Sequence, residues 1–244
     1  MRTSNKILLG TFLAILFIIT AIHAAIFSKY KSKSFVSMET LHYERYNTYD
    51  IKGVESVLIS GLQNVTIIPA DTAKVEIEKN DNGNNKVRYQ FDNGVLTIKG
   101  DTTYARNGNE PERVRSYQDV IIYLPQVKSI KSDFCELTIN GGKPSNISPL
   151  AMELQQTSLN LGGWNRENDT SAIRFDNIDI TKSNESSIDV SGKIIVKQLS
   201  MNLENSNFED GGLNCDSLFI NADNSSTIKI NGKNLAKTKF SVKP

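Results

Sequence analysis

The side chains best suited to chemistry in this 244-residue chain are acids of its C-terminal half. Two carboxyl groups held about 5–10 Å apart would suit glycoside cleavage, a reaction that some enzymes perform on a β-helical scaffold. The candidate pairs are Asp176 with Asp179, and Asp210 with Asp216. Asp176 lies in FDNIDI and Asp210 runs into two glycines, which is typical of turns. No repeated column of acids with a supporting His or Arg accompanies them, so we predict no catalytic residue.

Metal and cofactor binding have weaker support in the sequence. The stretches Asp81-Asn-Gly83 and Asp92-Asn-Gly94 contain oxygen ligands of the kind that calcium binds. Neither follows the EF-hand pattern or the repeated nonapeptide pattern. The two histidines, His23 and His42, both precede the region that holds the acids. We therefore predict no metal site and no cofactor.

The two cysteines are Cys135 and Cys215, and they form neither a CxxC pair nor a disulfide framework. Two interpretations are open: two small buried side chains, or one disulfide. The repeat described below places them about four repeats apart. If the repeats stack at about 4.8 Å, the cysteines lie ~19 Å apart, whereas a disulfide needs Cα atoms within about 7 Å. We expect them to be unbonded.

Composition narrows the class of protein. Lys and Arg number 28 against 27 Asp and Glu, and the net charge is +1. The basic residues are scattered without interleaved aromatic side chains, which argues against a nucleic-acid groove. Asn makes up about a tenth of the chain, more than is usual for a globular protein. Many Asn and few Leu favour strands and turns over packed helices.

An apolar run, ILLGTFLAILFIITAIHAAIF, occupies residues 7–27. As a helix it is about 32 Å long, which is enough to cross a bilayer core. A cleaved signal peptide is the alternative, but the run is long and no good small-x-small cleavage site ends it. No cysteine follows that could accept a lipid. We predict an uncleaved transmembrane signal-anchor at 7–27, in which His23 lies close enough to the helix end to reach the interface.

The orientation of this span follows from the character of the domain behind it. Residues 1–6 are expected to be a short cytoplasmic tail, and 28–50 a tether that leads into a first edge strand. Lys29, Lys31 and Lys33 slightly favour a cytoplasmic location after the span, but large domains are translocated regardless of such counts. The rest of the chain is rich in Asn and lacks nucleotide-binding motifs. We predict a single pass through the cytoplasmic membrane with the domain at 51–244 facing the periplasm or the outside.

From Ile51 onward the apolar side chains recur with a period of two, as they do in strands. Short runs such as Val65-Thr-Ile67 and Val75-Glu-Ile77 are separated by turn residues, including Asn82-Gly83. This pattern predicts an all-β domain. The longest irregular stretch is DTTYARNGNEPERVRS, residues 101–116. We interpret it as a charged loop and as the candidate for a specialised surface.

The second half contains a weak internal repeat of the form small-x-apolar-x-apolar-x-Gly. Examples begin at Cys135, Ser158, Ser186 and Ser226, and successive copies lie about 20 residues apart. One turn of a parallel β-helix uses about that many residues. We therefore predict a single-domain parallel β-solenoid. Its predicted interior side chains are Val65, Ile67, Val75, Ile77, Leu137, Ile139, Leu159, Leu161, Ile188, Val190, Ile228 and Ile230.

Three stretches of the first half carry a family resemblance: GLQNVTIIPAD at 61–71, KVEIE at 74–78 and DNGVLTI at 92–98. They resemble the putative auto-transporter adhesin, head GIN-domain family, whose members are common in Bacteroidota. The resemblance covers about residues 50–240 and implies Asn- and Ser-rich β-helical rungs. This chain has Asp92-Asn93-Gly94 where many members have Asp-Gly. It also has an apolar span where most members are expected to carry a secretion signal or a lipoprotein cysteine.

Two functional hypotheses follow. The favoured one is a membrane-tethered binding or structural module, adhesin-like, that presents an extended solenoid face to an envelope protein or glycan. The alternative is a carbohydrate-active enzyme on a pectinase-like β-helix. Two or three carboxylates that converge in a groove would support the enzyme.

Overall fold

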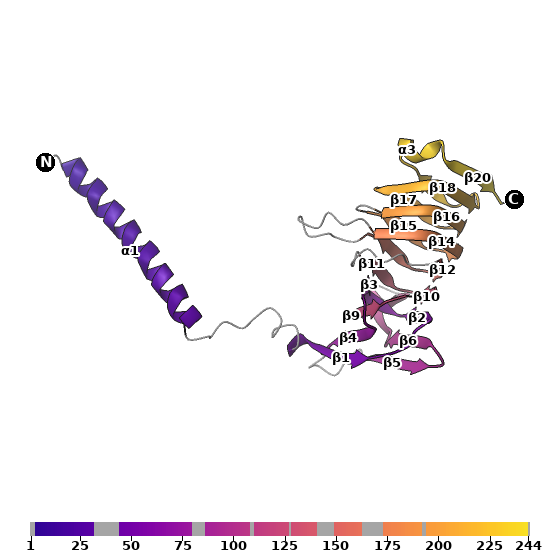
Figure 1. Ribbon diagram of the computed structural model, residues 1–244, viewed down its shortest axis with the longest axis horizontal. Helices are drawn as coiled ribbons and strands as arrows, with labels where there is room; N and C mark the ends of the chain where they lie inside the picture. Colours follow the sequence, from indigo (N-terminus) through magenta and orange to yellow (C-terminus); the bar gives the residue numbers. More distant parts are fainter. Residues whose placement is uncertain are drawn as a thin grey trace. The chain divides into compact units, whose positions relative to one another are not determined.

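The computed structural model describes residues 3–31, 44–79, 86–107, 110–126, 128–140, 149–162, 173–191 and 194–243. The chain divides into two compact units, Met1–Arg45 and Tyr46–Pro244. The first contains a long helix, and the second is built almost entirely from strands (Figure 1). The expectation of a mostly β chain with one N-terminal apolar helix is confirmed.

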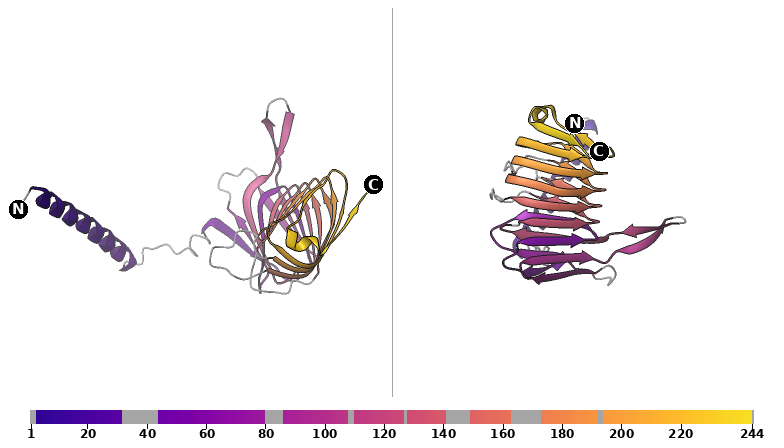
Figure 2. Two further views of the ribbon diagram at one scale, coloured as in Figure 1. Left: turned by 90° about the horizontal axis from the view of Figure 1, so that it is seen from above. Right: turned by 90° about the vertical axis from the view of Figure 1, so that its right-hand side faces the viewer.

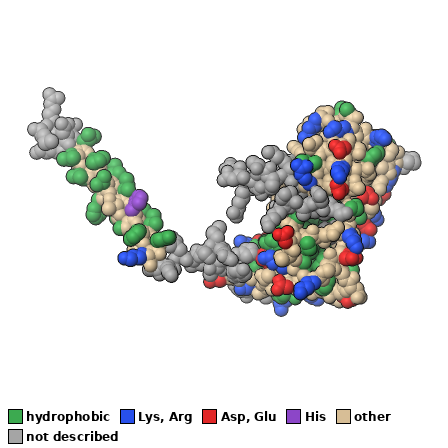
Figure 3. All heavy atoms as spheres, in the orientation of Figure 1, with side chains coloured by type: hydrophobic (Ala, Val, Ile, Leu, Met, Phe, Trp, Pro, Cys, Tyr) green, Lys and Arg blue, Asp and Glu red, His purple; other side chains and the backbone are tan. Residues whose placement is uncertain are grey.

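Helix α1 extends over Thr3–Lys31. Within it, Leu8–Lys31 form a 24-residue stretch that is long and apolar enough to cross a membrane. Most side chains of this stretch are apolar and exposed (Figure 3). The few polar groups bond to the helix itself: Thr20 Oγ1 donates to the Leu16 carbonyl at 2.8 Å, and His23 Nδ1 lies 2.9 Å from the Ile19 carbonyl oxygen. His23 is therefore accommodated by its own helix.

Tyr46–Pro244 contains two sheets of nine strands each within the described residues (Figure 1). Sheet A has the spatial order β1 (Tyr46–Asp50), β4 (Lys74–Glu78), β9 (Ser116–Leu124), β3 (Leu62–Pro69), β11 (Glu136–Ile139), β13 (Ser158–Leu161), β15 (Ser187–Val190), β17 (Asn207–Asp210), β19 (Thr227–Lys229). Sheet B has the order β5 (Val87–Asp92), β6 (Val95–Gly100), β2 (Ser56–Ser60), β10 (Ser129–Asp133), β12 (Leu150–Gln155), β14 (Ile173–Asn184), β16 (Ile194–Glu204), β18 (Leu213–Ala222), β20 (Thr238–Val242).

From β10 onward the chain alternates between the sheets, one strand in B and the next in A. Each strand pairs in parallel with the strand of the previous turn, as β11 does with β13 and β12 with β14. Parallel pairing dominates, as the sequence predicted. The sequence did not separate the strands into two sheets, and it did not foresee the antiparallel pairs made by β1, β4 and β5.

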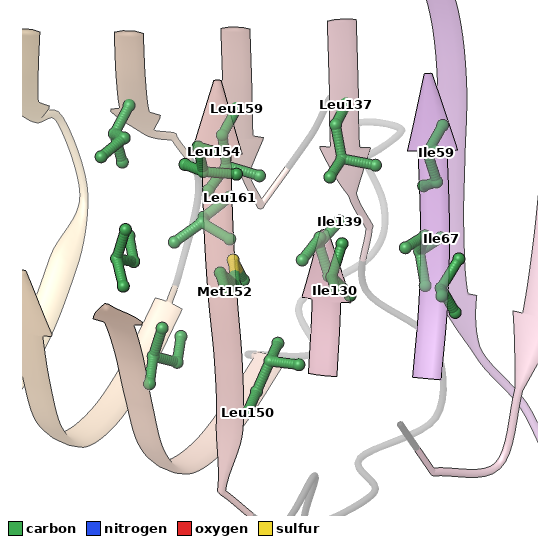
Figure 4. Close-up of a cluster of buried hydrophobic side chains, with 14 of the residues drawn as sticks. Ile59, Ile67, Ile130, Leu137, Ile139, Leu150, Met152, Leu154, Leu159 and Leu161 are labelled. Atoms are coloured by element: carbon green, nitrogen blue, oxygen red, sulfur yellow. The ribbon is translucent and has the colours of Figure 1, made fainter. Parts of the chain in front are cut away.

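The apolar core lies between the two sheets. In each strand the side chains alternate, so that Leu137 and Ile139 of β11 point inward beside Leu159 and Leu161 of β13 (Figure 4). All predicted interior residues are buried except Ile228 and Ile230, which are half-buried. These two belong to the last turn, where neighbours are present on one side only. At about 25 cal/mol per Å² of apolar surface, this inner stack is the main stabilising term of the fold.

A corner of one residue carries the chain from sheet B to sheet A. The corner residues have left-handed backbone with φ between 46° and 54°: Phe134, Gln156, Glu185 and Asn205. The small residue that follows each of them bonds to the carbonyl two positions earlier, as Ser186 Oγ does to Asn184 at 2.8 Å. The serine hydroxyls also accept a backbone N–H of the preceding turn: the Ser206 hydroxyl accepts the Ser186 N–H at 3.2 Å. This buried column explains why a small residue opens each repeat.

The predicted loop at 101–116 is wrong. Residues Thr103–Asn107 (β7) and Glu110–Val114 (β8) pair as an antiparallel hairpin that projects from the stack (Figure 2). The hairpin replaces the one-residue corner between β6 and β9. The chain then rejoins the stack at Ser116, which is fully buried and whose N–H donates to the Gly61 carbonyl at 2.8 Å. The sequence gave no sign of this pairing, because residues 101–116 lack the alternation of apolar and polar side chains that marks a strand.

The expectation for the cysteines is confirmed, since Cys135 and Cys215 are both free and buried. Cys135 follows the corner residue Phe134, and Cys215 lies on β18, several turns further along the stack. Burial raises the pKa of both thiols. They are therefore held as small apolar side chains in the protonated form and are poor nucleophiles.

Candidate functional site

A groove of about 510 Å³ crosses the outer face of sheet B. Its lining comes from strands β5, β6, β2, β10, β12 and β14. Residues of these strands alternate between the core and the outer face, so the outward set is fixed once Val57, Ile59, Leu96 and Ile98 are buried. The outward lining residues are Leu58, Ser60, Gln90, Thr97, Lys99, Lys131, Asp133, Glu153, Gln155 and Lys182.

Charges of both signs lie side by side along the groove. Lys131 on β10 is in register with Glu153 on β12, and Glu153 with Lys182 on β14. Lys131 Nζ lies 3.0 Å from Glu153 Oε1, and both side chains are about half exposed. Lys99 and Lys182 have no ion pair among the described residues. The groove therefore offers free ammonium groups at two separated positions.

Toward the edge strand β5 the groove adds an apolar side chain and an amide to these charges. Thr97, Leu58 and Lys131 are adjacent in register, with Gln90 paired to Thr97 from the edge strand β5. Leu58 supplies an apolar floor, and the Gln90 amide supplies both a donor and an acceptor. An extended polymer that alternates apolar and hydrogen-bonding groups would find both along this line.

The hairpin β7–β8 is fixed at the rim of the groove by two arginines. The Arg113 and Arg115 guanidinium carbons lie 4.4 Å and 4.6 Å from the centroid of the Phe134 ring. Arg113 also lies 3.8 Å from Asp133, a residue of the groove lining. Arg115 Nη1 donates to Glu136 at 2.9 Å. Cation–π stacking and these ion pairs hold the foot of the hairpin beside the carboxyl ends of the sheet B strands.

Sequence reasoning missed this groove. Alternation identifies the outward residues of each strand, but the lining comes from six strands spread between residues 58 and 182. Which of them lie side by side is decided by pairings such as β6 with β2 and β2 with β10. The one usable signal was the charged stretch at 101–116, which forms the hairpin at the rim.

The acids singled out from the sequence do not form a catalytic pair. Asp176 is ion-paired with Lys197 at 2.5 Å, and Asp179 is exposed on the outer face of β14. Asp210 is buried, whereas Asp216 is exposed on β18. The Asp210 carboxylate accepts from the Leu213 N–H at 3.0 Å, the Asn231 N–H at 3.2 Å and the Asn234 side-chain amide at 2.7 Å. Both of its oxygens are used to hold the fold.

The two calcium-like stretches have different outcomes. Asp92-Asn93-Gly94 forms the turn between β5 and β6, with φ of 48° at Asn93 and 77° at Gly94. Left-handed backbone at both central residues is what a tight hairpin turn requires, so Asn-Gly is explained by the turn. Asp81-Asn-Gly83 lies outside the described residues, as does His42. In the part of the chain that the structure describes, no group of three or more His, Cys, Asp or Glu could hold a metal ion.

A second polar cluster lies on the outer face of sheet A near β1. Glu76 on β4 is 1% exposed, and Lys74 Nζ lies 2.6 Å from its carboxylate. The same ammonium lies 4.3 Å from the centroid of the Tyr123 ring. Burial, with the neighbouring Glu76 charge and a hydrogen bond to it, raises the pKa of Tyr123 to about 12. Because the acid has a cationic partner and a hydroxyl donor, the arrangement is a satisfied buried pair, and it lies away from the groove.

With this geometry described, comparison with known proteins identifies the family. The chain belongs to the family described as "Putative auto-transporter adhesin, head GIN domain", whose model matches residues 55–243. The resemblance inferred from the sequence is confirmed. No match was found among curated proteins.

Solved structures of putative adhesins are similar to this chain. A putative adhesin from Bacteroides fragilis matches with a TM-score of 0.50 and 10% identity, covering 75% of this chain and 78% of that one. Putative adhesins from Parabacteroides distasonis and Parabacteroides merdae match with TM-scores of 0.46 and 0.44 and identities of 14% and 10%. Both cover 75% of this chain and 79% of their own. At this identity the likeness concerns the fold alone.

Proposed function

We propose that this chain is an adhesin-like binding module that holds an extended envelope polymer, a glycan or a protein segment, in the groove of sheet B. The two sheets would be the two faces of one β-solenoid, in which each turn contributes one strand to each face. Membership of the adhesin family supports an adhesin-like role outside the cytoplasm. The groove supplies what the family alone does not, a candidate surface on this chain.

The observation that carries the proposal is the mixed lining of the groove. An apolar floor at Leu58, amides at Gln90 and Gln155, and ammonium groups at Lys99 and Lys182 are distributed over five strands of sheet B. Binding sites commonly combine an apolar surface with a few placed polar groups. A long groove with spaced groups suits a repeating or extended ligand better than a small molecule.

The same groove gives no specific support to the carbohydrate-active enzyme. Its two acids, Asp133 and Glu153, both have side chains close to half exposed. Asp133 faces Arg113, and Glu153 is paired with Lys131. A glycosidase needs one carboxyl group kept protonated by a dry or anionic environment. These acids have cationic partners, which is the arrangement expected for charge recognition.

We also propose that α1 anchors the chain in the cytoplasmic membrane, with residues 7–27 retained and the β unit on the periplasmic or outer side. The length and apolar surface of α1 support this placement. Protease added to spheroplasts should then cut the projecting hairpin of β7 and β8, while inside-out membrane vesicles should protect it. A native N-terminus that begins after Ala24 or Ala25 would instead identify the segment as a cleaved signal peptide.

The binding proposal is tested by blocking the groove. The full chain, in detergent micelles, would be probed against immobilised envelope polysaccharide and against peptide fragments of envelope proteins. Thr97→Arg places a long cationic side chain in the groove beside Gln90 and should abolish binding to whichever probe is captured by the parent. Thr138→Arg is the matched control, because Thr138 is a half-buried, outward residue of β11 on the other sheet.

Binding that survives Thr97→Arg, or that is lost equally in Thr138→Arg, would refute the groove as the binding site. Release of reducing sugar ends from the bound polysaccharide by the parent chain would favour the enzyme.

A further inference from the structure

The C-terminal end of the β unit differs in character from the groove and from the rest of its surface. It is built from β19, β20 and the single-turn helix α3 (Gly232–Leu235) that connects them. Among the described strands, β19 pairs with β17 alone and β20 with β18 alone. Three large apolar side chains are exposed here: Leu235 at 64%, Phe240 at 55% and Val242 at 53%.

The exposure of these side chains is fixed by the fold. Asn234 is fully buried, and its amide donates to Asp210 and to the Leu213 carbonyl, so the next residue, Leu235, must face outward. Phe240 is in register with Ile220, which is a core residue one turn below. Phe240 is on the core side of its strand, but no described strand follows that would cover it. The apolar surface is thus a rigid feature of the end.

The same end is basic. Residues 227–243 contain five lysines and no acid: Lys229, Lys233, Lys237, Lys239 and Lys243. Two of them are ion-paired to earlier turns, Lys229 with Glu209 at 2.9 Å and Lys243 with Glu204 at 3.0 Å. The other three have no ion pair among the described residues, although Lys237 Nζ donates to the Cys215 carbonyl. Lys239 Nζ lies 5.4 Å from the centroid of the Phe219 ring.

We infer that this C-terminal end docks on a surface of anionic phospholipid. Apolar side chains that protrude among ammonium groups are the features by which proteins bind the interface of an anionic membrane. Leu235, Phe240 and Val242 would enter the headgroup boundary, and Lys233 and Lys239 would meet lipid phosphates. A shallow hollow of about 220 Å³ beside Phe219, Lys239 and Phe240 offers room for a headgroup.

A second copy of this chain fits the end less well. Two C-terminal ends that met face to face would bring the same unpaired lysines together, and like charges repel in an interface. An anionic lipid surface would neutralise the unpaired lysines and would also cover the exposed apolar side chains.

The test uses the full chain inserted through α1 into phosphatidylcholine nanodiscs, mixed with separate vesicles and separated by flotation. Vesicles that contain phosphatidylglycerol should capture the nanodiscs, while vesicles of phosphatidylcholine alone should not. Lys233→Gln with Lys239→Gln should weaken capture roughly tenfold. Phe240→Ser with Leu235→Ser should weaken it by a similar factor. The controls are Lys52→Gln with Lys86→Gln, at exposed positions outside the groove, and Tyr117→Ser, which is 60% exposed on β9.

Equal capture by both vesicle types, or a loss that is as large in the controls, would overturn the proposal. Vesicle-independent association of nanodiscs, removed by Phe240→Ser, would show that a second copy occupies the end instead. Loss of capture in high salt is expected, because screening weakens attraction between the lysines and the lipid surface.

Discussion

The two ends of the β unit are closed in different ways. At the N-terminal end, β1, β4 and β5 reverse direction, and contacts join the two sheets across the end. Gln118 accepts from the Val87 N–H of sheet B at 2.9 Å and donates to the Glu78 carbonyl of sheet A at 2.7 Å. The Tyr49 and Tyr89 rings, one from each sheet, have centroids 4.4 Å apart. Sheet A and sheet B are thus bonded together there.

At the C-terminal end the direction of the strands does not reverse. β20 continues the parallel order, and closure depends on one turn of helix whose Asn234 reaches Asp210. Apolar side chains and strand edges stay exposed. A stack built by repetition needs caps that break the repeat, and exposed edges otherwise invite further pairing. At the N-terminal end, contacts between the two sheets close the stack. At the C-terminal end, apolar side chains stay exposed and can contact another surface.

The largest predicted effect is the loss of unfolding free energy when an acid replaces a core residue, and it should be greater in the middle of the stack than at its C-terminal end. Val190→Asp places a carboxylate in the dry core between the sheets and should cost about 4 kcal/mol of unfolding free energy. Ile230→Asp introduces the same group at a half-buried position of the last turn and should cost less than half as much. Urea unfolding followed by circular dichroism measures both. Equal losses would mean that the last turn is covered as fully as the middle.

The C-terminal cap should be sensitive to a single acid. Asp210→Ala removes the acceptor for Leu213, Asn231 and Asn234 and should cost about 3 kcal/mol, since three donors lose their partner in a buried site. Glu209→Ala is the control, because the neighbouring acid is exposed and makes only a surface ion pair, worth at most about 1 kcal/mol. If both variants unfold at the same urea concentration, Asn234 does not hold the cap through Asp210.

A smaller effect is expected at the N-terminal end, where closure is shared among several contacts. Gln118→Ala should cost about 1–2 kcal/mol, because the Val87 N–H and the Glu78 carbonyl lose a partner in a partly buried position. Hydrogen exchange should quicken in β4 and β5 and stay unchanged in β16 and β18. Gln198→Ala, at an exposed position of β16, serves as the control and should change neither quantity. Faster exchange throughout the β unit would show that the ends are not independent.

The smallest effect concerns alkaline pH and is specific to the N-terminal end. Tyr123 has a pKa of about 12 in the folded chain, against 10 when unfolded. Its contribution is fully present below pH 10 and is lost as pH rises from 10 to 12, because the unfolded chain releases the proton first. Tyr123→Phe should therefore make unfolding free energy fall less steeply over this range. Parallel curves for variant and parent would contradict the burial of the Tyr123 hydroxyl beside Glu76.

Much of the interior could be predicted from the sequence. Val65, Ile67, Leu137 and Leu159 were correctly placed in the core, because alternation with a period of two is written locally in each strand. The repeated small residue was also visible, although its reason was not. A small residue such as Ser186 recurs because its hydroxyl bonds to the carbonyl before the left-handed corner. The neighbouring turns of the stack impose this requirement, because the same column of hydroxyls bonds from turn to turn.

The candidate site could not be predicted in the same way. Leu58 and Lys131 are 73 residues apart in sequence but adjacent in register on β2 and β10. β2 and β3 are followed in the chain by β6 and β9, which pair with them on one side. The chain then returns to the other side, where β10 pairs with β2. Pairing between distant segments depends on the whole stack, and no local pattern records it.

The sequence by itself determined the apolar helix, the all-β class, the inward side chains and the free cysteines. Each follows from a local property: the length of an apolar run, a period of two, or a spacing of repeats. Only the tertiary structure decided that 101–116 is a hairpin, that Asp210 is a buried cap residue, and that the two ends close differently. These features depend on which strands are neighbours, and a strand acquires its neighbours only when distant segments pair.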